Sequence, residues 1–172
     1  ITKDSKVCGI SFKEDTTLER FKKLGFANTW RIQPEQELGI RTPLASIETV
    51  QEQFTPEKVD SITKIHGQAD VVIARHILEH TQNPLEFIEA CKLLLKPTGY
   101  IVFEIPSCAY AFEQCDYTVL WEEHTIYFTP ETFHNCFAFG GLTLVDFERV
   151  KYPLEDSYIG IAQLEECKEA SF

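Results

Sequence analysis

The chain has 172 residues, of which 44% are hydrophobic and 12% aromatic, and this length suits one compact domain with its own core. Its formal net charge of −11 argues against nucleic acid as a partner, because nucleic-acid binders neutralise phosphates with clustered Lys and Arg. No apolar run reaches the roughly 18 residues of a membrane span, and the first residues lack a signal-peptide pattern. We therefore expect one cytoplasmic domain over residues 1–172 with no membrane partner, or a fragment of a longer chain, since the sequence contains no Met.

The first part of the chain has the pattern of a strand, a helix and a second strand. Residues 6–10 and 29–32 predict the strands, and residues 17–24 predict the helix between them, which Gly25 ends. The helix side chains expected to face inward are Leu18, Phe21 and Leu24. This order of elements forms the mononucleotide-binding unit of parallel α/β sheets. Residues 55–66 then predict a crossover helix, and its apolar stripe is formed by Val59, Ile62 and Ile65.

A second unit of strand, helix and strand follows. Residues 69–74 are a short apolar run typical of a buried parallel strand. Asn83 before Pro84 predicts a helix start, since the amide caps the first turn and proline needs no donor there. A Lys-Pro-Thr-Gly turn is expected to end this helix before a strand over 100–106. The helix side chains expected on the buried side are Leu85, Ile88, Cys91, Leu94 and Leu95. Because ligands of such sheets lie beyond the carboxyl ends of the strands, the first functional candidates are residues 75–80.

The run ADVVIARHILEH…NPLEFIEACKLLLKPTGYIVFEIP resembles the second half of class I S-adenosylmethionine-dependent methyltransferases, where a strand, a loop ending in L-x-H, a helix and an L-K-P-x-G turn recur in this order. A helix from Thr129 to Gly140 and closing strands over 142–150 and 158–162 suit the same sheet. The resemblance implies an α/β fold of the Rossmann-like, doubly wound type, with a mostly parallel sheet and an antiparallel final strand. It also implies S-adenosylmethionine as the cofactor.

The glycine loop departs from this family's pattern. Against the usual E-I-G-x-N-D-G-T, residues 9–16 read G-I-S-F-K-E-D-T, so Ser11 and Asp15 stand where glycines are expected. Gln33 stands at the position of the acidic residue that binds the ribose hydroxyls, and an amide is a weaker acceptor than a carboxylate. The cofactor-binding residues that the resemblance implies are Ser11, Phe12, Asp15, Gln33, Ala74, Arg75 and His76.

A second motif narrows the resemblance. Residues 121–130, WEEHTIYFTP, are similar to the Y-x-E-H-x-x-Y-F-(S/T) motif of the C-methyltransferases that act on nucleotide-linked deoxysugars. The catalytic residues carried over are His80, Glu123 and His124, and the implied partner is a small-molecule substrate such as a nucleotide-linked keto sugar. Trp121 replaces the family's tyrosine. That family's zinc-binding cysteine module and second domain lie outside this sequence.

The chemistry of carbon methylation agrees with these residues. A base must remove a proton beside a carbonyl while a donor stabilises the oxyanion that forms. A histidine titrates near neutral pH and can do the first task. We expect His124 to be the base, Glu123 to orient it or bind substrate, and His80 to be the oxyanion donor or a second acid/base. Oxygen or nitrogen methylation, which needs one base, stays open, as does the oligomeric state.

Three other interpretations remain. The altered loop is also what a catalytically inactive binding or scaffold domain of this fold would show. His76 to His80 fit the H-x-x-E-H pattern of zinc hydrolases, but that pattern needs a long helix, and a fresh helix start follows at Asn83. His80 as a turn cap and Glu123-His124 as a solvated loop are the structural interpretations. The six cysteines contain no C-x-x-C pair, and the sequence predicts no metal site.

Overall fold

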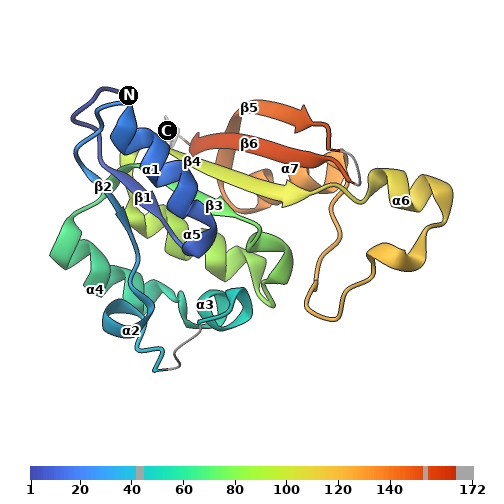
Figure 1. Cartoon of the computed structure of the whole chain (residues 1–172), viewed down its shortest axis with the longest axis horizontal. Helices are drawn as coiled ribbons and strands as arrows, with labels where there is room; N and C mark the ends of the chain where they lie inside the picture. Colours follow the sequence, from blue (N-terminus) through green and yellow to red (C-terminus); the bar gives the residue numbers. More distant parts are fainter. Residues whose placement is uncertain (42–44, 153–154, 166–172) are drawn as a thin grey trace, which may run out of the picture.

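The computed structural model describes residues 1–41, 45–152 and 155–165. These residues build a six-stranded sheet in the order β2-β1-β3-β4-β6-β5 (Figure 1). The strands are β1 (Val7–Gly9), β2 (Thr29–Arg31), β3 (Ala69–Arg75), β4 (Leu95–Pro106), β5 (Leu142–Val150) and β6 (Ser157–Leu164). Strands β2, β1, β3 and β4 are parallel, whereas β6 is antiparallel to both β4 and β5. The predicted mostly parallel α/β sheet with an antiparallel end is confirmed.

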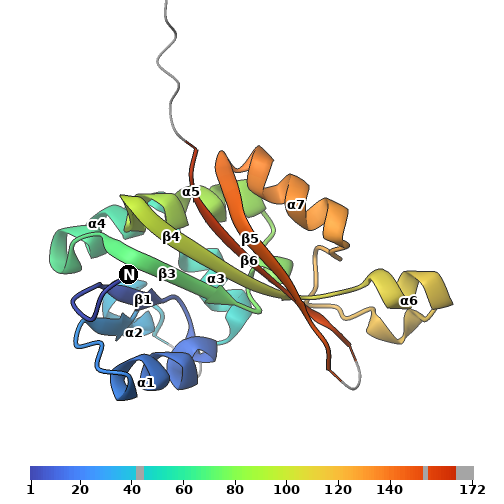
Figure 2. The same ribbon diagram turned by 90° about the horizontal axis from the view of Figure 1, so that it is seen from above.

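Helices cover both faces of this sheet, as in a doubly wound fold (Figure 2). They are α1 (Asp15–Lys23), α2 (Pro34–Glu37), α3 (Ile47–Gln53), α4 (Pro56–His66), α5 (Pro84–Leu94), α6 (Ala109–Gln114) and α7 (Pro130–Phe139), with short 3-10 turns η1 (Phe12–Glu14), η2 (Leu78–His80) and η3 (Tyr117–Val119). Alternate residues of β3 divide between the faces: Val71 and Ile73 pack with Leu18 of α1, whereas Val72 and Ala74 join the larger core under α4, α5 and α7. None of these helices is both long and apolar enough to cross a bilayer.

The predicted helix signals act as expected. The Asn83 side chain accepts a hydrogen bond from the Glu86 amide, with Pro84 in the first turn of α5. Gly25 and Gly67, which follow α1 and α4, have φ angles of 91° and 71°, and glycine takes this conformation without steric cost. Cys8 and Cys91 are buried free thiols, as predicted. Capping and turn chemistry therefore placed these boundaries correctly.

Three side chains predicted to face inward are exposed instead: Leu24, Ile65 and Leu85. Each lies at a helix end, just after α1, in the last turn of α4, or in the first turn of α5. Leu18, Ile62 and Ile88, which lie further inside the same helices, are buried, so burial is lost only in the terminal turns. The predicted turn before the fourth strand falls inside β4, which begins at Leu95 directly after α5. The pairing is irregular there, because Leu95 pairs with Ala69 and Tyr100 already with Val71, so residues 96–99 bulge out of the ladder. A Cβ on Gly99 would lie 2.7 Å from Leu95 Cδ1, which shows how closely this strand start folds on itself.

The sequence analysis missed the short helices α2, α3 and α6. Among them α3 matters for the site because it carries Glu48 to the carboxyl edge of the sheet. The Ser46 side chain caps α3 by accepting a hydrogen bond from the Thr49 amide, and Ile47 and Val50 are buried. Seven residues are too few for a clear apolar period, which explains why the pattern did not reveal this helix.

Candidate functional site

The carboxyl ends of β1, β3 and β4 meet at one edge of the sheet, and a pocket of about 430 Å³ opens beside them. Its lining includes Lys13, Glu48, His76, Glu79, His80 and His124. A smaller hollow of about 210 Å³ lies between α3 and α5 and has neither a histidine nor a basic side chain in its lining. The pocket at the sheet edge combines volume with titratable groups, so it is the candidate site.

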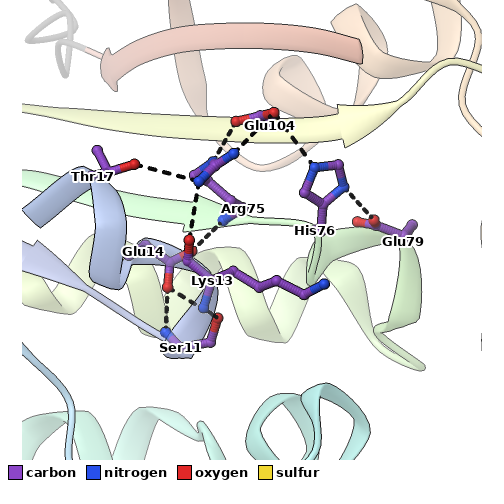
Figure 3. Close-up of polar contacts among 8 residues, drawn as sticks. All are labelled: Ser11, Lys13, Glu14, Thr17, Arg75, His76, Glu79 and Glu104. Atoms are coloured by element: carbon purple, nitrogen blue, oxygen red, sulfur yellow. Dashed lines mark hydrogen bonds and ion pairs between the residues drawn. The ribbon is translucent and has the colours of Figure 1, made fainter. Parts of the chain in front are cut away.

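The loop after β1 is closed by a buried carboxylate. The Glu14 carboxylate accepts hydrogen bonds from the Ser11 amide (2.5 Å), the Ser11 hydroxyl (3.0 Å) and the Arg75 amide (2.7 Å). Figure 3 shows these contacts, which join the loop to the end of β3. Glu14 is 0% exposed, and burial raises its pKa to about 7 even though the hydrogen bonds from Arg75 and Ser11 lower it. The loop amide of Ser11 and the amide of Arg75 at the end of β3 therefore bind a group of the chain itself.

Gly9 makes this closure possible. A Cβ added to Gly9 would lie 2.6 Å from Glu14 Cβ, so no side chain fits there while Glu14 is folded back over the strand end. The pattern E-I-G-x-N-D-G-T has its strand carboxylate at the position of Gly9. In this chain Glu14 supplies a carboxylate at the same strand end from the far side of the loop.

Arg75 and Glu104 form an ion pair across β3 and β4. The Arg75 guanidinium donates to Glu104 through Nε and, at 3.4 Å, through Nη2, and it also donates to the Lys13 carbonyl at 3.0 Å (Figure 3). The hydrogen bond to Glu104 raises the pKa of Arg75, although partial burial opposes this. Arg75 is absent from the lining of the pocket. Its guanidinium is therefore occupied by the protein, not presented to a substrate.

His76 has a φ angle of 48°, an uncommon conformation for a residue with a side chain. Its Nε2 lies 3.4 Å from Glu104 Oε1 and its Nδ1 lies 3.5 Å from Glu79 Oε1. Hydrogen bonding to Glu104 and then to Glu79 raises the pKa of His76 to about 9. Burial alone would raise the pKa of Glu104, but hydrogen bonds from His76 and Arg75 lower it to about 2. His76 is therefore a cation at neutral pH.

A distant loop brings His124 to the same edge. The amides of Thr125 and Ile126 donate to the Glu79 carbonyl at 2.9 and 3.1 Å, and the Thr125 hydroxyl donates to the Thr81 carbonyl at 2.6 Å. These bonds attach residues 124–126 to η2. As a result the ring centroids of His80 and His124 lie 4.7 Å apart, and the ring planes meet edge to face at 88°.

Glu79, His80 and His124 form the polar centre of the pocket, with one ligand-type atom from each lying within 4.8 Å of the others. Among the described residues, Glu79 Oε2 and His80 Nδ1 are buried atoms that lack a hydrogen-bond partner. Glu48 Oε1 lies 3.2 Å from His80 Nδ1, close enough for an ion pair but not aligned as a hydrogen bond. Burial lowers the pKa of His124, although the charge of Glu79 opposes this. Unused polar groups of this kind mark a place where a ligand can bind.

The structure brings together all three predicted catalytic residues, because His80, Glu123 and His124 line one pocket. Glu123 itself is exposed, and it makes no hydrogen bond or ion pair with the other residues that the structure describes. The carboxylate next to His124 is that of Glu79, which the sequence analysis treated only as part of H-x-x-E-H. That pattern does not lie on one helix, since η2 covers three residues and His76 precedes it with positive φ. The position of Glu79 next to His80 in the sequence was the signal that could have identified Glu79 as a pocket residue.

The predicted cofactor residues are more scattered. Of the seven, His76 lines the pocket. Ser11 and Ala74 are buried in the loop and in β3, and Arg75 is paired with Glu104. Phe12, Asp15 and Gln33 are exposed; Asp15 binds Arg31, and the Gln33 amide donates to the Arg31 carbonyl. Sequence reasoning missed Lys13 and Glu48, which line the pocket from η1 and α3.

Residues 9–146 match a family model described as methyltransferase domain. This chain belongs to that family. The C-methyltransferase NovU of Streptomyces niveus is 26% identical over 129 residues, which cover 75% of this chain and 30% of NovU. A ubiquinone biosynthesis O-methyltransferase of Shewanella pealeana is 49% identical over 37 residues, 22% of this chain and 16% of that enzyme. The part matched by this chain thus spans less than a third of the length of either relative.

Solved methyltransferase structures share the fold. The 1,6-didemethyltoxoflavin-N1-methyltransferase of Burkholderia thailandensis, solved with S-adenosylhomocysteine, has a TM-score of 0.62 and 11% identity, with 95% of this chain and 72% of that one covered. The magnesium protoporphyrin IX methyltransferase of Synechocystis, also with S-adenosylhomocysteine, has a TM-score of 0.61 and 10% identity over 94% of this chain and 75% of that one. At such identities the similarity concerns the fold.

Proposed function

We propose that this methyltransferase-family chain transfers a methyl group from S-adenosylmethionine to a small molecule, with carbon methylation of a nucleotide-linked keto sugar as the specific reaction. The observation that carries this proposal is the contact between His80 and His124 in the pocket. These residues are distant in the chain, and their ring centroids lie 4.7 Å apart. The similarity to NovU, a C-methyltransferase, supports the carbon acceptor.

The pocket fits the cofactor in volume and charge. Its size of about 430 Å³ falls within the range of small-molecule sites, roughly 300–1,000 Å³. Lys13 and the cationic His76 suit the carboxylate of S-adenosylmethionine, and Glu48 offers acceptor oxygens for its hydroxyl or ammonium groups. The cofactor, when bound, supplies an electrophilic methyl group. The amides of Ser11 in the loop and Arg75 at the end of β3 take no part, because the Glu14 carboxylate accepts their hydrogen bonds.

The histidines have properties that suit proton transfer. Since burial lowers the pKa of His124, its imidazole is neutral at neutral pH and can accept a proton from the acceptor carbon. Glu79 is the nearest carboxylate and can stabilise the imidazolium that results. His80 lies where it can donate to an oxyanion on the same substrate. Glu123, exposed at the pocket wall, has the position of a substrate-binding group.

A second candidate function is that of a catalytically inactive binding domain. The closed loop favours it, because Glu14 uses the amides that otherwise face a ligand near β1. The two candidates differ in cofactor binding and in turnover.

Calorimetric titration with S-adenosylmethionine and S-adenosylhomocysteine tests the proposal first. One-site saturable binding is expected, followed by methyl transfer to nucleotide-linked keto sugars, measured by mass spectrometry. Loss of turnover with retained cofactor binding in His124→Ala, and no loss in the surface control His134→Ala, would support the assignment of the base. No binding at millimolar cofactor would instead favour the inactive domain.

A further inference from the structure

The Glu79 side chain combines nearly complete burial with an unsatisfied oxygen. Glu79 is 1% exposed, its Oε1 lies 3.5 Å from His76 Nδ1, and its Oε2 has no hydrogen-bond partner in the part of the chain that the structure describes. A buried acceptor without a partner lowers the stability of the fold, because the loss of its hydration is not offset by a hydrogen bond. Native proteins keep such a group where something else binds it.

The neighbours of this oxygen are other electron-pair donors. Ligand-type atoms of Glu79, His80 and His124 lie within 4.8 Å of one another. In a tetrahedral zinc site with bonds of about 2.1 Å, donor atoms lie about 3.4 Å apart. Small side-chain rotations therefore bring the three donors to bonding distance of one ion. His80 Nδ1, also unpartnered, has Glu48 Oε1 at 3.2 Å, which places a second carboxylate at the edge of the cluster.

We propose that Glu79, His80 and His124 bind a divalent transition-metal ion of the zinc type. Two imidazoles and one carboxylate suit Zn²⁺ or Co²⁺, whereas Mg²⁺ prefers oxygen donors alone. Three protein ligands leave a fourth position open for a water or substrate atom, and all three residues line the pocket. The site differs from H-x-x-E-H, because His124 takes the place of His76, which pairs with Glu104.

The surroundings hold the donors in place. The Glu79 carbonyl accepts the amides of Thr125 and Ile126, so the segments that carry Glu79 and His124 are bonded to each other through their backbones. The second oxygen of Glu79 contacts His76, and Glu48 lies beside His80. Outer partners of this kind orient metal ligands and increase affinity. Substitution of the Glu79 side chain leaves the backbone bonds intact, which makes a clean test possible.

Metal binding is measured on untagged, chelator-treated protein. Titration with Co²⁺ followed by visible absorption, and with Zn²⁺ followed by calorimetry, is expected to show one ion per chain. The Co²⁺ spectrum is expected to lack a thiolate charge-transfer band, which separates this site from the exposed Cys115. Glu79→Gln, His80→Ala and His124→Ala are each expected to weaken binding by about 100-fold or more, since loss of an outer partner alone costs about 10–100-fold.

Two further variants control the experiment. His134→Ala removes an exposed histidine of α7 and is expected to leave affinity unchanged, whereas Glu48→Gln is expected to have a smaller effect than the ligand variants. Thermal melts in chelator show that each variant is folded. Absence of saturable binding, or equal affinity in the wild type and the three ligand variants, overturns the metal site.

The metal-binding measurement needs no methyl transfer, so each proposal can fail separately, although the ion and a base at His124 compete for the same nitrogen. An ion held by His124 occupies the lone pair that a base needs. If transfer depends on His124 as base, saturating Zn²⁺ inhibits it; if the ion polarises the acceptor oxygen, chelation abolishes it. Failure of metal binding with transfer retained leaves the proposed function standing, and metal binding without cofactor binding leaves the metal site standing.

Discussion

Two parts of the sheet edge, the end of β1 and the segment after β3, differ in whether their buried polar groups have hydrogen-bond partners. At the end of β1, Glu14 accepts three hydrogen bonds and closes the loop on the chain itself. Beyond β3, Glu79 and His80 keep buried atoms without hydrogen-bond partners, in a pocket of about 430 Å³. A satisfied network rigidifies a fold, whereas an unsatisfied one is a place for a ligand. The comparison assigns a structural role to the first part and chemistry to the second.

The largest expected effect comes from the second part. His124→Ala is expected to lower the rate of methyl transfer by about 10²–10⁴-fold, the usual contribution of a general base, with little change in thermal stability. Because the pKa of His124 is lowered, the acidic limb of the pH–rate profile should lie below the ordinary histidine range. Steady-state kinetics from pH 4 to 9 measure both. Unchanged activity in this variant removes His124 from the base role.

The second-largest expected effect concerns the ion pair of Arg75 with Glu104, and it is a loss of stability. Glu104→Gln leaves Arg75 and His76 charged without their shared carboxylate, and breaking a buried pair in this way costs about 3 kcal/mol at pH 6. Urea unfolding measures the loss. Glu148→Gln is the matched control, since Glu148 is an exposed carboxylate of β5 that makes no ion pair with another described residue.

The pH dependence of this stability has a defined sign. The pKa of Glu104 falls from 4.5 to about 2, so its stabilising contribution is complete above pH 4.5 and is lost as pH falls towards 2. The pKa of His76 rises from 6.5 to about 9, so its contribution is complete below pH 6.5 and is lost as pH rises through 9. Glu104→Gln should flatten both limbs. A variant profile parallel to that of the wild type would contradict this assignment.

Sequence alone predicted the main elements of the fold and placed His80, Glu123 and His124 as candidates, which line one pocket, but it did not predict which side chains contact each other. Caps such as Asn83 and Gly67 fix where helices begin and end because their chemistry is local. Both Glu79 and Glu123 adjoin a histidine of the pocket in sequence, and only the backbone bonds of residues 125 and 126 to η2 bring Glu79 close to His124. Such long-range contacts leave no trace in periodicity.

The closed loop did have a sequence signal. Ser11 followed three residues later by Glu14 is a capping box, and the structure contains it. In the sequence analysis the glycine pattern directed attention to the substitutions at residues 11 and 15. The steric dependence of Glu14 on Gly9 is visible only in the folded loop. A Cβ added to Gly9 would lie 2.6 Å from the Cβ of Glu14.

A smaller effect tests that dependence. Gly9→Ala forces Glu14 away from the strand end and is expected to lower the free energy of unfolding by about 2 kcal/mol, the usual cost of overpacking. Glu14→Gly removes the Cβ that an alanine at position 9 would meet, so in the double variant the cost of Gly9→Ala should be smaller by about 1 kcal/mol than in the wild-type background. Urea unfolding of the four proteins gives the coupling. Additive effects would mean that the two positions act independently.

The smallest expected effect separates the two glutamates of the pocket. Glu123 is exposed and unpaired among the described residues, so Glu123→Gln should change stability by less than about 0.5 kcal/mol and affect mainly the KM for the acceptor. Glu79→Gln should instead lower kcat, because Glu79 is the carboxylate that faces His124. Glu122→Gln, the exposed neighbour outside the pocket lining, is the matched control. Only the carboxylate that stabilises the imidazolium of His124 is expected to affect the chemical step. If kcat falls for Glu123→Gln and not for Glu79→Gln, the orienting role therefore belongs to Glu123.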